Sequence, residues 1–160
     1  MNQETIQSLI EISRIHESQL LYALNNLAYM FPLTEEKVVK FTQQEVILVD
    51  FLVYRFSRLQ DFMGASLVDA VLIQLNEFSD RFTMIDKMNK LEKFELIKDA
   101  RLWQDIRKLR NLLTHEYPDR PQLVADFLNQ TYSLSFELLE ILNNLLRSLE
   151  SSTTTLSSRN

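Results

Sequence analysis

Apolar side chains recur every three or four residues through most of the chain, with polar residues between them. This spacing places the apolar positions on one face of an amphipathic helix. The pattern predicts long helices over about residues 2–30, 42–76, 99–117 and 121–149, and a short helix over about residues 83–96. We therefore expect an all-α fold, an antiparallel up-and-down bundle of four long helices plus one short helix.

Local signals mark the ends of several of these helices. Phe31-Pro32 ends the first, because proline disfavours the helical conformation in the residue before it. Thr42-Gln-Gln-Glu45 fits a capping box, in which two side chains bond to free backbone N–H groups at a helix start. Asp99 is suited to cap the helix that follows it, and Pro121 to stand in the first turn of the last helix.

The second long helix carries two features of its own. Gly64, the only glycine in the chain, falls in its middle, where glycine costs about 1 kcal/mol relative to alanine. We expect another helix to pack closely there. Arg55, Arg58 and Asp61 follow one helical face at positions i, i+3 and i+6, which indicates either a salt-bridged surface or a groove or dimer surface facing the third long helix.

Composition limits the class of protein. With 160 residues, 46% of them apolar, the chain is predicted to form one domain over residues 1–150, followed by a disordered Ser/Thr-rich tail over residues 151–160. The chain has no cysteine, which excludes disulfides and thiolate chemistry. No apolar run approaches the roughly 18 residues that a membrane span needs, so we expect a soluble, cytoplasmic protein without membrane contact.

Charge narrows the choice of ligand. The net charge of −5 argues against broad, non-specific binding of nucleic acid. Residues 98–120 differ from the rest, because they hold six basic residues against four acidic ones. This local excess is compatible with a small phosphate site.

The chemistry of the chain is concentrated in Arg110-Asn-Leu-Leu-Thr-His-Glu-Tyr-Pro118, at the end of the third long helix. On a helical wheel the predicted core stripe consists of Leu102, Ile106, Leu109 and Leu113. Asn111 and His115 lie one turn apart on the opposite face, and Arg110 and Tyr117 lie at the edge of the stripe. His115 is therefore either a surface histidine near a helix C-terminus or part of a site that faces away from the core.

An arginine and a histidine without further ligands can carry out phosphodiester chemistry on RNA. The imidazole serves as general base or acid, and the guanidinium stabilises charge that develops on the phosphate. No second histidine lies at i+3 or i+4 from His115, so no metal site and no cofactor are expected. The candidate phosphate-binding or interface residues are Arg107, Thr114, Arg58 and Asp61.

The same residues resemble a known family. Arg110-Asn-Leu-Leu-Thr-His115-Glu-Tyr117 is similar to the Arg-x4-His-x-Tyr motif of HEPN-domain proteins, specifically the HepT-like toxins, in which a polar residue such as Asn111 usually follows the arginine. Residues 54–64 and Leu91-Glu-Lys-Phe94 also resemble helices of this group, and the similarity extends over about residues 42–145.

The resemblance implies a metal-independent RNase toxin that cleaves RNA such as tRNA or mRNA, with Arg110, Asn111 and His115 as the catalytic residues. It implies a homodimer in which the two motif helices face one another. It also implies a cognate nucleotidyltransferase antitoxin that transfers AMP onto Tyr117. Two alternatives stay open: a non-catalytic HEPN-fold subunit that serves a nucleotidyltransferase, and a dimeric helical protein without RNA chemistry.

Overall fold

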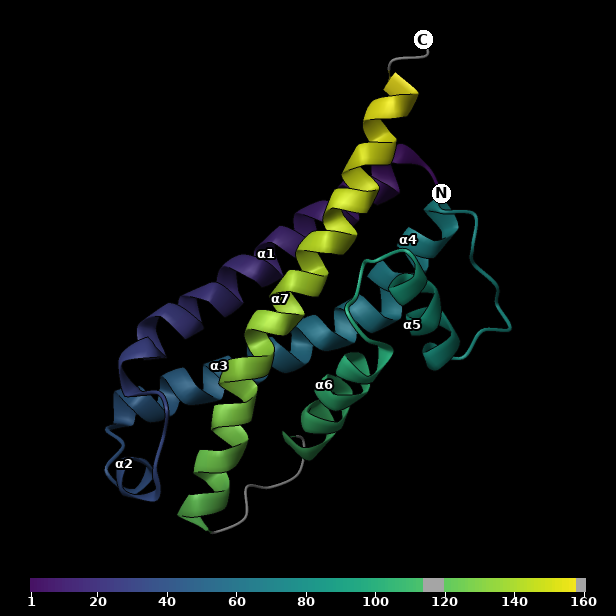
Figure 1. Ribbon diagram of the computed structural model, residues 1–160. Coiled ribbons are helices and arrows are strands. Elements are labelled where there is room, and N and C mark those ends of the chain that lie inside the picture. Colours follow the sequence, from purple (N-terminus) through teal and green to yellow (C-terminus); the bar gives the residue numbers. More distant parts are fainter. Residues whose placement is uncertain (114–119, 158–160) are drawn as a thin grey trace.

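The structure is a computed structural model that describes residues 1–113 and 120–157, and side chains through residue 151 (Figure 1). All regular structure in these residues is helical, which confirms the predicted all-α class. The elements are α1 (Gln3–Leu27), η1 (Ala28–Met30), α2 (Glu35–Val39), α3 (Gln43–Phe62), η2 (Met63–Leu67), α4 (Val68–Gln74), α5 (Met84–Lys93), α6 (Ala100–Leu113) and α7 (Pro121–Ser157).

The predicted helix starts are confirmed by hydrogen bonds at the caps. The Thr42 hydroxyl accepts a bond from the Glu45 backbone N–H, and the Glu45 carboxylate accepts one from the Thr42 N–H at 2.8 Å, which completes the capping box of α3. The Asp99 carboxylate accepts the Arg101 N–H at 2.7 Å and so caps α6. α7 begins at Pro121.

One helix was not predicted, and one helix end differs from its predicted position. α2, a single short helix capped by Thr34, was not predicted. α7 continues to Ser157, so the predicted helix end near Leu149 is wrong. No glycine or proline interrupts this segment, and Arg14 of α1 pairs with Glu150 at 3.2 Å. Residues 158–160 lie outside the described part of the chain, and the disorder of the tail stays a prediction.

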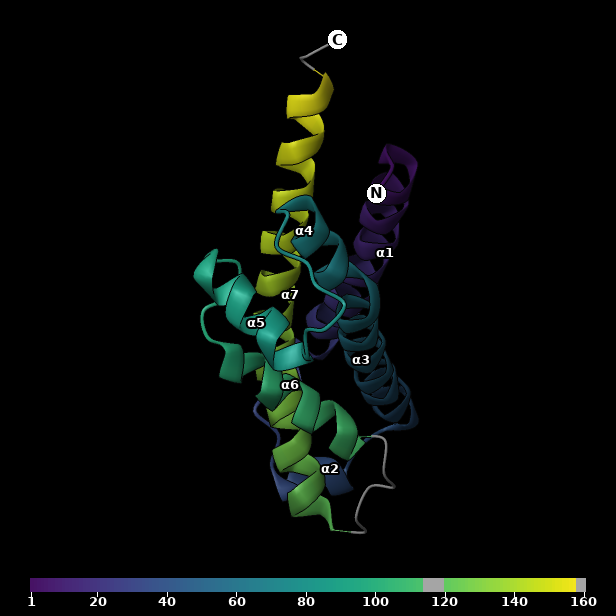
Figure 2. The ribbon, with the colours of Figure 1, turned by 90° about the vertical axis from the view of Figure 1, so that its right-hand side faces the viewer.

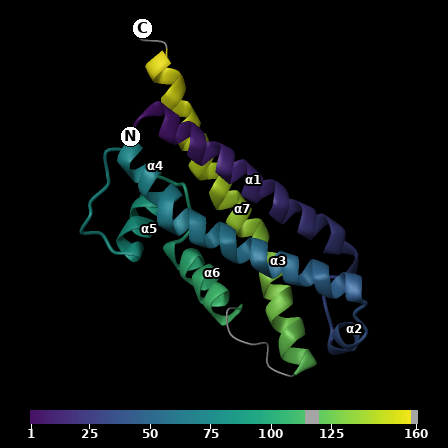
Figure 3. The same ribbon diagram turned by 180° about the vertical axis from the view of Figure 1, so that it is seen from behind.

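The arrangement of helices places α3 at the centre of one side of the molecule. α3 contacts α1, α6 and α7, and α6 contacts α3, α5 and α7. Figure 2 shows α6 in front of α7, with α1 and α3 to the right of α7. Seen from behind in Figure 3, α3 crosses between α1 and α6. The helix that carries the motif therefore packs directly on the helix that carries Arg58 and Asp61.

Gly64 lies in η2, a π-helical turn that joins α3 and α4 into one continuous rod. A Cβ atom at this position would stand 3.3 Å from Cζ2 of Trp103 and 3.7 Å from Cε of Met84. The predicted close packing at Gly64 is thus confirmed, and its neighbour is the indole ring of α6. π-helical turns occur often at functional sites, and the glycine allows the two helices to approach here.

No helix in the described ranges is apolar over enough of its length to cross a lipid bilayer.

Candidate functional site

The buried face of α6 differs from the predicted stripe. Ile106 and Leu109 are buried as expected, but Leu102 and Leu113 are only half-buried. Trp103, with 1% of its surface exposed, is buried in their place. The bulky indole packs against Gly64, and this contact turns the buried face of α6 toward Trp103.

This rotation changes the position of Arg110. Arg110 stands two turns after Trp103, so it lies within the buried face of α6 and not at its edge. Its side chain is 28% exposed and reaches α3, where Nη2 donates to Oδ2 of Asp61 at 2.6 Å. Nη1 also donates to Oδ1 of Asn111 at 3.5 Å, which is long for a hydrogen bond. Nε of Arg110 is buried and has no hydrogen-bond partner among the described residues.

The Asp61–Arg110 contact decides between the two predictions made for the polar face of α3. Asp61 does not belong to a salt-bridged face within its own helix, because its partner is on the motif helix, 49 residues away in the chain. The carboxylate is 40% exposed, so the pair lies at the edge of the protein, where solvent screens it only in part.

The ion pair borders a pocket of about 250 Å³ between α3 and α6. Its lining comes from both helices and from the start of α5, and consists of Gln60, Asp61, Gly64, Met84, Trp103, Arg107, Arg110 and Asn111. The charged groups are the guanidinium groups of Arg107 and Arg110 and the carboxylate of Asp61, so the pocket has one net positive charge. We call this cavity the α3–α6 pocket.

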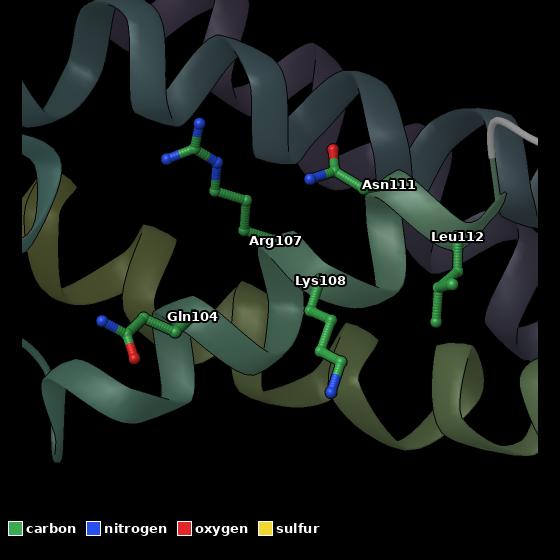
Figure 4. Close-up of a pocket in the computed structure, with 5 residues that line it drawn as sticks. All are labelled: Gln104, Arg107, Lys108, Asn111 and Leu112. Atoms are coloured by element: carbon green, nitrogen blue, oxygen red, sulfur yellow. The ribbon is translucent and has the colours of Figure 1, made fainter.

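A second, more superficial hollow of about 330 Å³ adjoins it along α6. Gln104, Lys108 and Leu112 line only this hollow, whereas Arg107 and Asn111 line both. In Figure 4 Arg107 and Asn111 point to the same side of α6, and Lys108 and Leu112 point to the other. Three of the sequence candidates, Arg107, Arg110 and Asn111, therefore meet at one place with Asp61.

Arg58 is a sequence candidate that does not line the α3–α6 pocket. It is exposed on α3 and makes no ion pair with any residue in the described ranges. Arg55, one turn earlier, lies over the rings of Phe51 and Tyr54, at 5.0 and 5.3 Å from their centroids. These two arginines belong to a neighbouring surface of α3 and not to the α3–α6 pocket.

His16 is the one histidine whose surroundings are described. Its ring centroid lies 5.1 Å from that of Phe62, and its buried Nδ1 bonds to none of the residues that the structure describes. Burial lowers the pKa of His16 from its usual 6.5, and the positive charges of Arg55 and Arg58 lower this pKa further. The side chain is half-buried against α3, so it is a packing residue of α1.

Thr114, His115 and Tyr117 lie in residues 114–119, outside the described ranges. The wheel that placed His115 beside Asn111 therefore stays a prediction. Among the residues that are described, no group of three or more histidine, aspartate or glutamate side chains could hold a metal ion.

The sequence pattern did not single out three of the pocket residues, Gln60, Met84 and Trp103, and two of these carry polar groups. Gln60 is polar but only 6% exposed, and Trp103 is the sole tryptophan of the chain. The sequence contained a feature that could have identified each of them. Gln60 stands four residues before Gly64 on the same helical face, and the large ring of Trp103 is suited to pack against a glycine.

Comparisons of the chain with protein-family models, with curated proteins and with solved structures give no match.

Proposed function

We propose that this protein is a metal-independent endoribonuclease, the toxin of a toxin–antitoxin pair similar to the HepT-like group of HEPN-domain proteins. The observation that carries the proposal is the meeting of Arg110, Asn111 and Arg107 at one pocket that keeps a net positive charge in an acidic protein. A pocket of this charge suits a single phosphate group of an RNA strand, and guanidinium groups bind phosphate through planar pairs of N–H donors.

The reaction would be an attack by the ribose 2′-hydroxyl on the adjacent phosphorus. His115 would take the proton of the 2′-hydroxyl as its oxygen forms the new P–O bond. Arg110 would stabilise the negative charge on the phosphate oxygens, with Asn111 beside it. The P–O5′ bond then breaks, the leaving oxygen takes up a proton, and the products are a 2′,3′-cyclic phosphate and a 5′-hydroxyl.

The proposal includes an assembly. Each chain would form a four-helix up-and-down bundle with one additional short helix, and two chains would pair through α6 about a twofold axis. Two copies of the site would then form one composite cleft. The partner is a nucleotidyltransferase antitoxin, which would transfer AMP from ATP onto Tyr117. The adduct adds bulk and negative charge where an RNA phosphate must bind, so it would block the cleft.

The direct test is RNA cleavage by purified protein in the presence of EDTA. We expect wild type to cleave, and His115→Ala and Arg110→Ala to lose at least about 100-fold in rate, which is the usual contribution of an acid–base group. The chain offers matched controls: His16→Ala removes the other histidine, and Arg101→Ala removes an exposed arginine of α6 that pairs with Asp99. Both controls should cleave like wild type. Cleavage that survives His115→Ala would overturn the assignment.

The antitoxin is tested separately, by intact-mass measurement after coexpression with a small nucleotidyltransferase encoded next to the toxin gene. Added AMP units should map to Tyr117, and Tyr117→Phe should stay unmodified. A modification that maps to another residue would contradict the proposed mode of neutralisation.

One observation favours the alternative, a non-catalytic HEPN-fold subunit that binds a nucleotidyltransferase or its substrate. Arg110 already has an anionic partner in Asp61. If this ion pair serves only to fix α6 on α3, the pocket would lack the cation that the reaction needs. Wild-type protein without RNase activity that still binds the nucleotidyltransferase would establish this alternative.

A further inference from the structure

The α3–α6 pocket has a second part beside its charged residues. Gln60, Gly64, Met84 and Trp103 line it without carrying charge. None of them has a role in the phosphate chemistry proposed above.

Two polar side chains border this part of the pocket. The Gln60 side chain is only 6% exposed and lines the cavity. The Nε1 of Trp103 is buried and has no hydrogen-bond partner among the described residues. Proteins pair the great majority of their buried polar groups, so an unpaired indole N–H beside a cavity needs an explanation.

Gly64 shows that the two groups share one space. A Cβ atom on Gly64 would stand 3.3 Å from Cζ2 of Trp103 and 3.8 Å from Nε2 of Gln60. Cζ2 belongs to the same edge of the indole as Nε1, so this edge and the Gln60 amide both lie next to the bare glycine. Any larger residue would fill this space. Glycine leaves it open, even though alanine has the higher helix propensity.

We infer that this part of the pocket binds one nucleobase of the RNA strand, next to the phosphate held by Arg110. The inference rests on the proposed function, and adds recognition of sequence to it. A glutamine amide presents a donor and an acceptor side by side, which matches neighbouring donor and acceptor atoms on a base edge, as on adenine. Met84 and the Trp103 ring supply apolar contact. Pockets for drug-sized ligands measure roughly 300–1,000 Å³, and the volume of about 250 Å³ here suits a smaller group such as one base.

Binding can be measured without any cleavage, because Trp103 is the sole tryptophan and lines the pocket. Wild-type protein is titrated with the four nucleoside 5′-monophosphates and with ribose 5-phosphate, and the indole N–H signal is followed by NMR. At least one monophosphate should bind about 10-fold tighter than ribose 5-phosphate, which has the same sugar phosphate but no base. Equal affinities for all five compounds, or no shift of the indole signal, would overturn the base pocket and leave only a solvent-filled space.

Two variants test the residues. Gln60→Met keeps a long side chain but removes the amide, and should weaken the preferred monophosphate by about 5- to 100-fold while leaving ribose 5-phosphate unchanged. Gly64→Ala should also weaken the base-dependent binding, because its methyl group enters the space beside Trp103. Gln44→Met, at an exposed position in the first turn of α3, is the control and should bind like wild type. Unchanged preference in folded Gln60→Met and Gly64→Ala would refute the inference.

Cleavage of RNA then separates the inference from the proposed function. If wild type cleaves preferentially beside one base and Gln60→Met cleaves without that preference, the pocket reads the RNA strand. If cleavage depends on His115 but wild type and Gln60→Met cut the RNA at the same positions, the RNase stands and the inference fails. If base-dependent binding occurs and RNA is not cleaved at all, the base pocket stands and the RNase fails. Base-dependent binding with an unchanged cleavage pattern would identify a free nucleotide as the ligand and contradict a role in substrate recognition.

Discussion

The Asp61–Arg110 ion pair links α3 to α6, and its strength can be measured by a double-mutant cycle. The cycle consists of Asp61→Asn, Arg110→Gln and the double variant. Each substitution removes a charge and keeps a polar side chain. The coupling energy of the cycle reports the interaction of the two groups apart from their other contacts.

The magnitude follows from the geometry. Two unit charges about 4 Å apart attract by about 1 kcal/mol in bulk water and by about 4 kcal/mol at an effective dielectric constant of 20. The two side chains are 28% and 40% exposed, so the pair lies between these limits. Partial desolvation and the ordering of two side chains offset part of the attraction. We expect a coupling energy of about 1–2 kcal/mol, and a melting temperature of Asp61→Asn that is lower by about 2–8 °C.

Urea unfolding followed by Trp103 fluorescence is the assay, because this single tryptophan of α6 is buried against Gly64 of η2. All proteins are compared at one concentration. The chain supplies a control cycle in Glu36 and Lys40, an exposed i, i+4 pair at 2.7 Å in the short helix α2 and its C-cap. That cycle should give about 0.3–0.5 kcal/mol. A coupling no larger than the control value for Asp61 and Arg110 would show that the pair does not fasten α6 to α3.

Two further predictions concern helix ends and titration. Thr42→Ala removes the N-cap of α3 and should lower the free energy of unfolding by about 1 kcal/mol, while Thr42→Ser should restore most of it; circular dichroism melts give both values. The pKa of His16 is lowered on folding, by burial and then by Arg55 and Arg58, so the unfolded chain binds a proton more readily than the folded one. The free energy of unfolding should therefore fall as pH drops below about 6.5, and His16→Gln should lose that part of the slope between about pH 5 and pH 7 in urea titrations; an unchanged slope would contradict the assignment.

Much of the fold can be predicted from local signals. The capping box at Thr42 and the proline at Pro121 set helix starts through neighbouring residues, and such contacts are visible in the sequence. The capping box of α5, formed by Thr83 and Asp86, was missed because an aspartate stands where Glu or Gln is usual. The end of α7 was missed because serine and threonine lower helix propensity only slightly, and a contact with α1 lies there.

The site shows where local signals are insufficient. The pattern nominated Arg110 and Asn111, but centred the buried face of α6 on Leu102 and Leu113. The true centre is set by the contact of Trp103 with Gly64, two residues from different helices that no periodicity connects. Asp61 had two possible roles in the sequence, and its distance to Arg110 in space decides between them.

The position of Arg110 in the buried face reconciles a structural and a chemical role. A guanidinium has five N–H donors, and its contacts with described residues use one to Asp61 and a long one to Asn111. Asp61 can therefore hold the group in the pocket while other donors stay available to a phosphate. Arg107 lines the same pocket and supplies a second positive charge that Asp61 does not neutralise. The ion pair is thus compatible with catalysis, and the choice between an RNase and a binding subunit depends on whether cleavage requires His115.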